Sequence, residues 1–136
     1  MVGTVVLPIE EVARKTKRKL VTAFQELTQD ITEEVIHATP WDTGFLRASW
    51  FVSINSPGGI PKGVGLDPAG VQTIARASAE IAGAEIGDVI YVLNGAVYAK
   101  FLEFGTAYIS PRAFVRGTIA RAPQIAQRTI ERIARK

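Results

Sequence analysis

The chain has 136 residues, of which 47% are apolar, and its formal net charge at pH 7 is +3. This length and composition are typical of a folded domain, so we expect residues 1–136 to form a single domain. The chain has no cysteine and one histidine, His37, which excludes a disulfide framework and a thiolate metal site and nearly excludes a His-based metal cluster or a Ser-His-Asp triad.

The first predicted element is a long helix over residues 8–39. Pro8 can open this helix and Pro40 ends it. At 1.5 Å per residue it would be about 45 Å long, which is long for so small a domain. We therefore expect one end to project beyond the core, namely the basic N-terminal half, where residues 14–19 hold five positive charges. Its apolar residues recur at helical spacing on one face: Leu20, Phe24, Leu27, Ile31, Val35 and Ala38.

A turn-rich segment at 40–45 contains the tripeptide Asp42-Thr43-Gly44. Aspartic proteases carry their catalytic carboxylate in the same tripeptide, but they are almost wholly β, and helical spacing at both ends of this chain contradicts that fold. We interpret the tripeptide as a structural turn. Gly44 supplies a positive φ, and the Asp42 carboxylate accepts backbone N–H bonds or pairs with Arg47.

The middle of the chain predicts two strands. Residues 46–54 alternate apolar and polar side chains, and residues 88–94 are nearly continuous in apolar ones. Between them, residues 55–65 are dense in Gly and Pro and predict a flexible loop. Residues 67–83 predict a helix with Asp67 as its N-cap.

Two further helical segments follow. Residues 96–105 could form a short helix, and residues 111–135 predict a terminal helix that Pro123 must kink or split. Its apolar stripe consists of Val115, Ile119, Ala122, Ala126, Ile130 and Ile133. These elements predict an α+β fold: a small, mainly antiparallel sheet packed against long N- and C-terminal helices.

The chain holds few residues that could perform chemistry. Glu103 and Asp88 could form a carboxylate pair, but the sequence fixes no distance between them. His37 lies late in the long helix and is typical of a packed or exposed histidine. We expect no catalytic, cofactor or metal site and no enzyme. Core packing best explains the aromatic residues Tyr91, Tyr98, Phe101 and Phe104.

Three short motifs follow one another along the chain. They consist of Thr39, Pro40, Asp42, Thr43, Gly44, Leu46 and Arg47; then Tyr98, Ala99, Glu103, Gly105 and Thr106; then Pro111, Ala113 and Phe114. Their order and spacing resemble the tail-completion, or neck, family of long-tailed bacteriophages, over about residues 8 to 135. Members of that family are minor tail components that join head and tail. The chain departs from the commoner pattern in a longer insert, from Pro57 to Gly83, and in Pro123.

The resemblance implies a structural virion protein and not an enzyme. The chain would be made in the host cytoplasm and would form a homo-oligomeric ring, a hexamer, at the head–tail junction. Its partners would be the head connector and the tail terminator or tube. DNA would pass nearby without specific nucleic-acid binding, and no cofactor or membrane would take part. The alternative is a small basic DNA-binding protein of prophage or plasmid origin, because residues 14–19 and 112–136 are rich in Lys and Arg.

The segment around Glu103 is the predicted contact with a neighbouring subunit or partner. Glu103 lies between large apolar residues, which is costly unless its carboxylate stays at the surface or finds a donor. Gly105 suggests a chain reversal that a side chain would obstruct. We expect a bonded Glu103 to hold the loop that meets a neighbour, and the alternative is that Glu103 points to water. The predicted interface consists of Tyr98, Leu102, Glu103, Phe104, Gly105 and Thr106.

Overall fold

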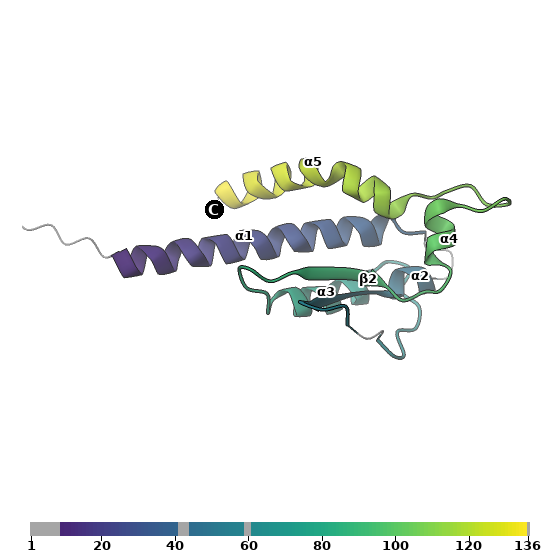
Figure 1. Cartoon of the computed structure of the whole chain (residues 1–136), viewed down its shortest axis with the longest axis horizontal. Helices are drawn as coiled ribbons and strands as arrows, with labels where there is room; N and C mark the ends of the chain where they lie inside the picture. Colours follow the sequence, from purple (N-terminus) through teal and green to yellow (C-terminus); the bar gives the residue numbers. More distant parts are fainter. Residues whose placement is uncertain (1–8, 41–43, 59–60, 136) are drawn as a thin grey trace, which may run out of the picture.

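The computed structural model describes residues 9–40, 44–58 and 61–135. Figure 1 shows α1 as a central layer, with α5 along one side of it and α3 and a two-stranded sheet along the other. This arrangement confirms the predicted α+β class. In chain order the elements are α1 (Ile9–Ala38), α2 (Phe45–Ala48), β1 (Trp50–Ile54), α3 (Val71–Ile81), β2 (Ile90–Asn94), α4 (Ala99–Phe104) and α5 (Phe114–Ala134).

The sheet is antiparallel, and its register pairs Trp50 with Asn94 and Ile54 with Ile90. The strand predicted over residues 46–54 is wrong in its first part, because residues 45–48 form the short helix α2. Gly44, at φ 79°, starts this turn, and its carbonyl accepts the N–H of Ala48 at 3.0 Å. A helix of four residues is too short for its period to be distinguished from strand alternation.

The main core lies at the C-terminal end of α1. Val35 and Ile36 pack there against Trp50 and Phe114, whose rings meet edge to face at 6.2 Å between centroids. The indole N–H of Trp50 donates to the hydroxyl of Thr39 at 2.8 Å, which satisfies two buried polar groups. A second core cluster, formed by Val52, Ala77 and Ile81, lies between α3 and the sheet.

The other end of α1 extends past the body of the molecule (Figure 1). Side chains from Ala13 to Leu20 are all exposed, including the run of basic residues at 14–19. The prediction that the basic N-terminal half projects is therefore confirmed. We call residues 9–20 the arm.

Two helices begin later than the sequence predicted, because a residue in the left-handed conformation precedes each of them. The first residues of the predicted helix 67–83 form a turn, and α3 begins after Gly70, at φ 79°. The Asp67 carboxylate still caps α3, because it accepts both the N–H and the hydroxyl of Thr73, at 2.8 and 2.7 Å. Similarly, α5 begins after Ala113, at φ 45°, and not at Pro111.

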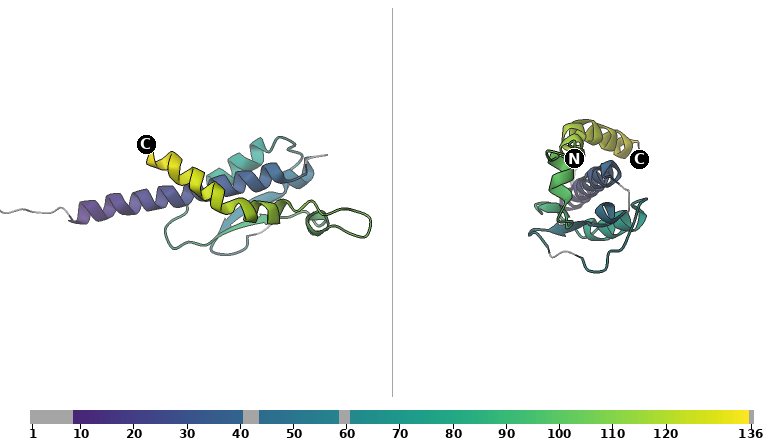
Figure 2. Two further views of the ribbon diagram at one scale, coloured as in Figure 1. Left: turned by 90° about the horizontal axis from the view of Figure 1, so that it is seen from above. Right: turned by 90° about the vertical axis from the view of Figure 1, so that its right-hand side faces the viewer.

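Of the two outcomes predicted at Pro123, a kink or a split, the split does not occur. The helix α5 runs without a break from Phe114 to Ala134. Figure 1 shows its ribbon curving, and Figure 2 shows it crossing obliquely over α1. A proline removes one helical hydrogen bond and can bend a helix without ending it.

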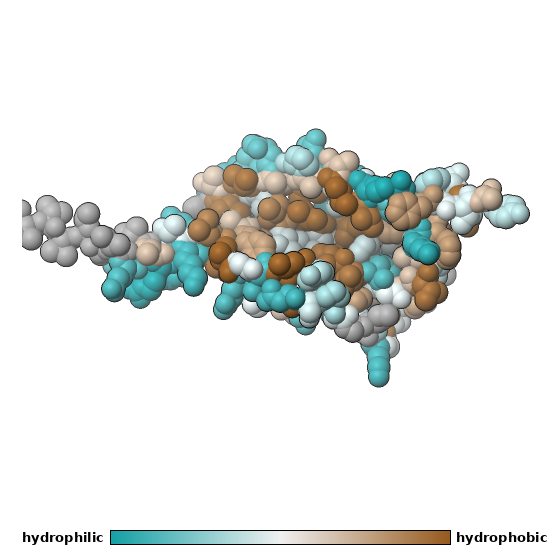
Figure 3. Space-filling view, viewed as in Figure 1, coloured by the Kyte–Doolittle hydropathy of each residue, from teal (hydrophilic) through white to brown (hydrophobic). Residues whose placement is uncertain are grey.

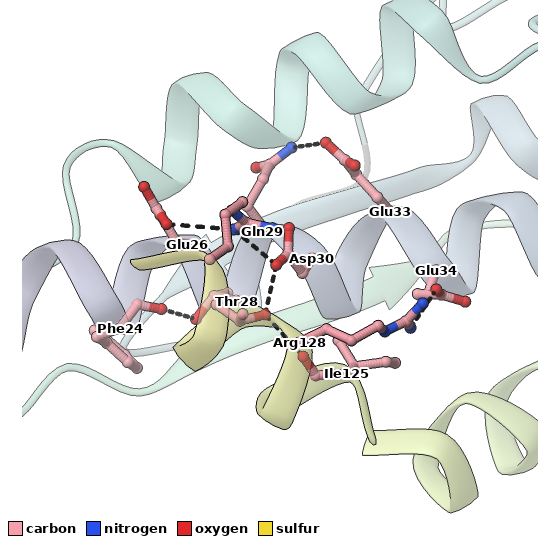
Figure 4. A network of polar contacts seen from close by, with 11 residues as sticks. Phe24, Glu26, Thr28, Gln29, Asp30, Glu33, Glu34, Ile125 and Arg128 are labelled. Carbon is pink, nitrogen blue, oxygen red and sulfur yellow. Dashed lines mark hydrogen bonds and ion pairs between the residues drawn. The ribbon is translucent and has the colours of Figure 1, made fainter. Parts of the chain in front are cut away.

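Ion pairs join α5 to α1 (Figure 4). Arg132 Nη2 lies 2.9 Å from Asp30 Oδ2 and 3.2 Å from Glu26 Oε2. One turn earlier, Arg128 Nη2 lies 3.1 Å from Glu34 Oε1. These side chains recur at helical spacing on each helix, so they fix how both helices are rotated about their axes.

The face that α5 was predicted to bury is wrong. Thr118, Ile125 and Thr129 are buried against α1, whereas Ile119 and Ile130, expected in the core stripe, are 66% and 59% exposed. The hydroxyl of Thr129 donates to Asp30 Oδ2 at 2.5 Å, so its burial leaves no polar group without a partner. Two members of the predicted stripe, Ile119 and Ile130, are thus turned toward solvent, whereas the other four are half-buried.

Candidate assembly surface

The predicted interface residues lie on α4 and the turn that follows it. Leu102 packs against the main core and Glu103 is buried, while Phe104 is exposed. Beyond Gly105, the hydroxyl of Thr106 accepts the N–H groups of Tyr108 and Ile109, both at 3.1 Å. The N–H of Thr106 donates to the carbonyl of Ile109 at 2.8 Å. The loop therefore has a defined internal structure.

Glu103 caps α5 from outside that helix. Its carboxylate is 5% exposed and accepts the backbone N–H groups of Val115 and Arg116 at 2.7 and 3.1 Å. The Nε of Arg116 donates to the same carboxylate at 2.8 Å. These two backbone groups are among the N–H groups that an α-helix leaves unpaired at its start. Glu103 thus ties α4 to α5 within one chain.

Burial and hydrogen bonding act on the Glu103 carboxyl in opposite directions. Burial pushes its pKa upward, but bonds from Arg116 and Val115 outweigh burial, so the pKa lies below its ordinary value. The carboxyl is therefore ionised at neutral pH. Its charge is compensated by Arg116 and by the positive end of the helix dipole.

Gly105 makes the reversal that the sequence predicted. Its φ is 77° and its ψ is 175°, a backbone conformation that essentially only glycine adopts. A Cβ at this position would lie 2.7 Å from the Ile109 carbonyl and 2.8 Å from Pro111. The prediction that a side chain would obstruct this turn is confirmed.

The end of the molecule formed by residues 97–112, here called the tip, exposes apolar side chains. Val97 is 91% exposed and Tyr108 is 97% exposed. The expectation that Phe101 and Phe104 pack in the core is wrong, because both are exposed here together with Ile109. The guanidinium of Arg116 lies 4.7 Å from the Phe104 ring centroid and covers part of it. Aromatic residues that are exposed together in this way are typical of protein–protein contacts.

A groove of about 390 Å³ lies beside the tip, between α4 and the first turns of α5. The buried rings of Trp50 and Phe114 contribute to its lining, and Phe104 and Ile119 lie at it as well. Figure 3 shows apolar residues gathered between α5 and α1 and toward β2. On α5, Ile119 at the groove and Ile130 farther along the helix are both exposed, and we call these two residues the apolar strip.

Of the residues in the predicted structural turn, Gly44 directly precedes α2 and Arg47 lies within it. Arg47 donates to the carbonyls of Thr39, Pro68 and His37, at 3.1, 2.5 and 2.6 Å, and so satisfies acceptors at the end of α1. A Cβ on Gly44 would lie 2.5 Å from Pro68. Asp42 and Thr43 lie outside the described residues, so the proposed bonds of Asp42 stay a prediction.

The remaining candidates from the sequence do not come together. The Asp88 carboxylate accepts from Asn55 and from the N–H of Glu85, at 3.0 and 2.7 Å, whereas Glu103 caps α5. Among residues 9–40, 44–58 and 61–135, no group of three or more His, Asp or Glu could hold a metal ion. No helix in these ranges is long and apolar enough to cross a membrane. Residues 55–58 and 61–65 contain no helix or strand, and the mobility of loop 55–65 stays a prediction.

The sequence predicted Asp67 as a cap, although directly before its helix, but it did not predict that Glu103 caps α5 or that the groove exists. The caps reach N–H groups 6 and 12 residues away, beyond any local capping pattern. The groove depends on α5 crossing residues that are distant in sequence. The exposure of Phe101 and Phe104 at the tip was also not predicted, because the sequence placed both residues in the core.

One comparison with known proteins finds a match. A family model described as "Bacteriophage HK97-gp10, putative tail-component" matches residues 8–105. The matched range is more than half of the chain, and it runs from the start of α1 to the Gly105 turn, ending before α5. Neither the curated proteins nor the solved structures contain a match.

Proposed function

Because this chain belongs to the HK97-gp10-like family of bacteriophage tail components, we propose that it is a tail-completion protein that joins head and tail. In this proposal the chain forms a homo-oligomeric ring, a hexamer, at the head–tail junction of the virion. Its neighbours are the head connector on one side and the tail terminator or tube on the other. Its function is structural, without catalysis, cofactor or membrane.

The tip is the observation that carries this proposal. Its exposed aromatic side chains need a partner, and the turn at Gly105 and the Glu103 cap hold them in a fixed position. A contact surface that is ordered before binding loses less conformational entropy on assembly. The predicted interface residues around Glu103 thus divide into two roles. Phe104 offers contact area, whereas Glu103 and Gly105 position it.

The test is a phage lysate in which a stop codon removes this chain. We expect filled heads and finished tails to accumulate separately in electron micrographs, and purified chain added to the lysate to join them. Joined, infectious particles that form without the chain would overturn the proposal.

The arm favours a second candidate, a small DNA-binding protein. Five basic residues in an exposed helix are suited to phosphate contacts, which depend strongly on salt. Light scattering with and without duplex DNA separates the two functions. The tail-completion proposal expects no change in mass near physiological salt. A DNA-dependent rise in mass that disappears in the triple variant Arg14→Glu, Lys17→Glu, Arg18→Glu would favour DNA binding.

A further inference from the structure

We propose that the groove beside α4 receives the loop at the tip of a second copy of this chain, with Tyr108 as the side chain that enters it. The inference rests on the proposed function, in which copies of the chain meet in a ring. It adds which two surfaces of the chain meet each other.

The lining of the groove favours an apolar side chain as its occupant. Six of its ten lining residues are apolar or aromatic, and three of the four polar ones have hydrogen-bond partners within the chain, whereas the ammonium of the exposed Lys100 lies 5.4 Å from the Phe101 ring centroid. Glu103 and Arg116 are bonded to each other. The Asn94 amide donates to the Leu46 carbonyl at 2.9 Å and accepts from Ala96 at 2.9 Å. A polar guest would therefore find few free partners, whereas an aromatic ring would gain contact area.

Tyr108 has the properties of such an occupant. It is 97% exposed, and the bonds from its own N–H and that of Ile109 to Thr106 fix the turn that presents it. A tyrosine buries a large apolar ring at a low entropy cost while its hydroxyl stays at the rim of a pocket. The groove volume of about 390 Å³ is sufficient for one aromatic side chain.

The loop cannot reach the groove of its own copy. Its two ends are tied to α4, by the bond from Gly105 N–H to the Phe101 carbonyl and by that from Arg112 N–H to the Leu102 carbonyl, both at 2.8 Å. Figures 1 and 2 show the loop projecting away from the body. Tyr108 can therefore enter such a groove only on another molecule.

The proposed contact joins two different surfaces, a loop on one copy and a groove on the next. Contacts of this heterologous kind generate closed rings when the rotation between copies closes. The apolar strip begins at the groove with Ile119, and Ile130 farther along α5 would give the neighbour further area to cover. The ion pairs between α1 and α5 make this strip available, because they turn these isoleucines outward.

Disulfide cross-linking tests the contact directly, because the natural chain has no cysteine. Two differently tagged chains, one with Tyr108→Cys and one with Ile119→Cys, are expressed together and oxidised mildly, both as purified protein and in particles. We expect a disulfide that joins the two tags. A chain with Leu66→Cys in place of Ile119→Cys is the control, because Leu66 is exposed but lies in neither surface. Cross-linking no stronger than with this control overturns the proposal.

A second measurement separates this contact from the proposed function. Tyr108→Ala is expected to melt like the natural chain, because the side chain is exposed, and to fail in joining heads to tails, whereas Tyr108→Phe is expected to join them. If Tyr108→Ala fails in joining but no disulfide forms between the two tags in particles, the tip meets a different protein. The groove proposal is then wrong and tail completion stands. If heads and tails join without the chain, tail completion is wrong even where the disulfide forms.

Discussion

At the scale of single residues, Glu103 links two helices through one carboxylate. We predict that Glu103→Gln lowers the free energy of unfolding by about 1–3 kcal/mol, because the amide places an NH₂ group where N–H donors need an acceptor. Urea denaturation of the isolated chain measures this change. Glu80→Gln is the control, because Glu80 is exposed on α3. Equal stability of both variants would show that the cap contributes nothing.

The same carboxylate makes stability depend on pH. Burial raises the pKa of Glu103 and of Asp67, but hydrogen bonds to each carboxylate outweigh burial, so both pKa values lie below their ordinary ones. The unfolded chain then binds these protons more readily than the folded chain. Their stabilisation is complete above the unfolded pKa values of about 4 and is lost as the pH falls through the lower folded values.

We therefore predict a fall in the free energy of unfolding of the natural chain as the pH is lowered from about 5 to about 2. The fall should be smaller in Glu103→Gln and smaller again when Asp67→Asn is added. Urea titrations at a series of pH values measure it. Curves that run parallel in all three proteins would contradict the assignment of the two caps.

Gly105 offers a test of the turn that positions the tip. We predict that Gly105→Ala destabilises the chain by about 1–3 kcal/mol, because it combines a left-handed φ with contacts to Ile109 and Pro111. Gly63→Ala is the matched control. Gly63 also has a positive φ, of 67°, but no atom lies within 4 Å of its Cβ position. Thermal melting of the two variants separates crowding from backbone strain, and equal losses would show that crowding is unimportant.

At the scale of elements, apolar periodicity predicted the presence of both long helices but not the face that α5 buries. The α5 stripe was identified correctly as apolar, yet Thr118 and Thr129 are buried in place of Ile119 and Ile130. Hydrophobic spacing reports which residues share a side of a helix. Which side meets α1 is decided by pairs such as Arg132 with Asp30, and such long-range pairs cannot be recognised from one sequence.

The predicted first residues of α3 and α5 were wrong for a related reason. Gly70 and Ala113 precede their helices in a left-handed conformation, and neither residue has a side-chain cap of its own. The carboxylates that replace such caps, Asp67 and Glu103, come from earlier in the chain. Local capping rules place a cap next to its helix. By contrast, Gly105 was predicted correctly, because its effect is confined to one turn.

The arm leads to a prediction about hydrogen exchange. A helix of this length without tertiary packing is marginal in water. We predict that amides from Ala13 to Leu20 exchange at least about ten times faster than those from Thr28 to Val35, which pack between α5 and the sheet side of the molecule. Mass spectrometry of the free chain measures the ratio. Equal protection would mean that something in solution already covers the arm.

At the scale of the whole molecule, substitutions in the apolar strip should affect assembly without affecting folding. We predict that Ile130→Asp leaves the melting temperature of the isolated chain almost unchanged, because Ile130 is largely exposed, but prevents oligomer formation. Ala120→Asp is the control, since Ala120 is also exposed on α5 but lies outside the apolar stripe. Light scattering and thermal melting measure the two effects. Oligomers that form equally with both variants would exclude the strip from the contact.

The position of α1 between two layers has a consequence for synthesis on the ribosome. This helix is made well before α5, because its partners on the α5 side, such as Arg128 for Glu34, lie 94 residues later. Until α5 emerges, the acidic side chains of α1 that pair with it have only solvent or other molecules to contact. Contacts of such long sequence separation slow folding and leave incomplete chains prone to association. Chains that end before α5 are therefore expected to associate more readily than the whole chain.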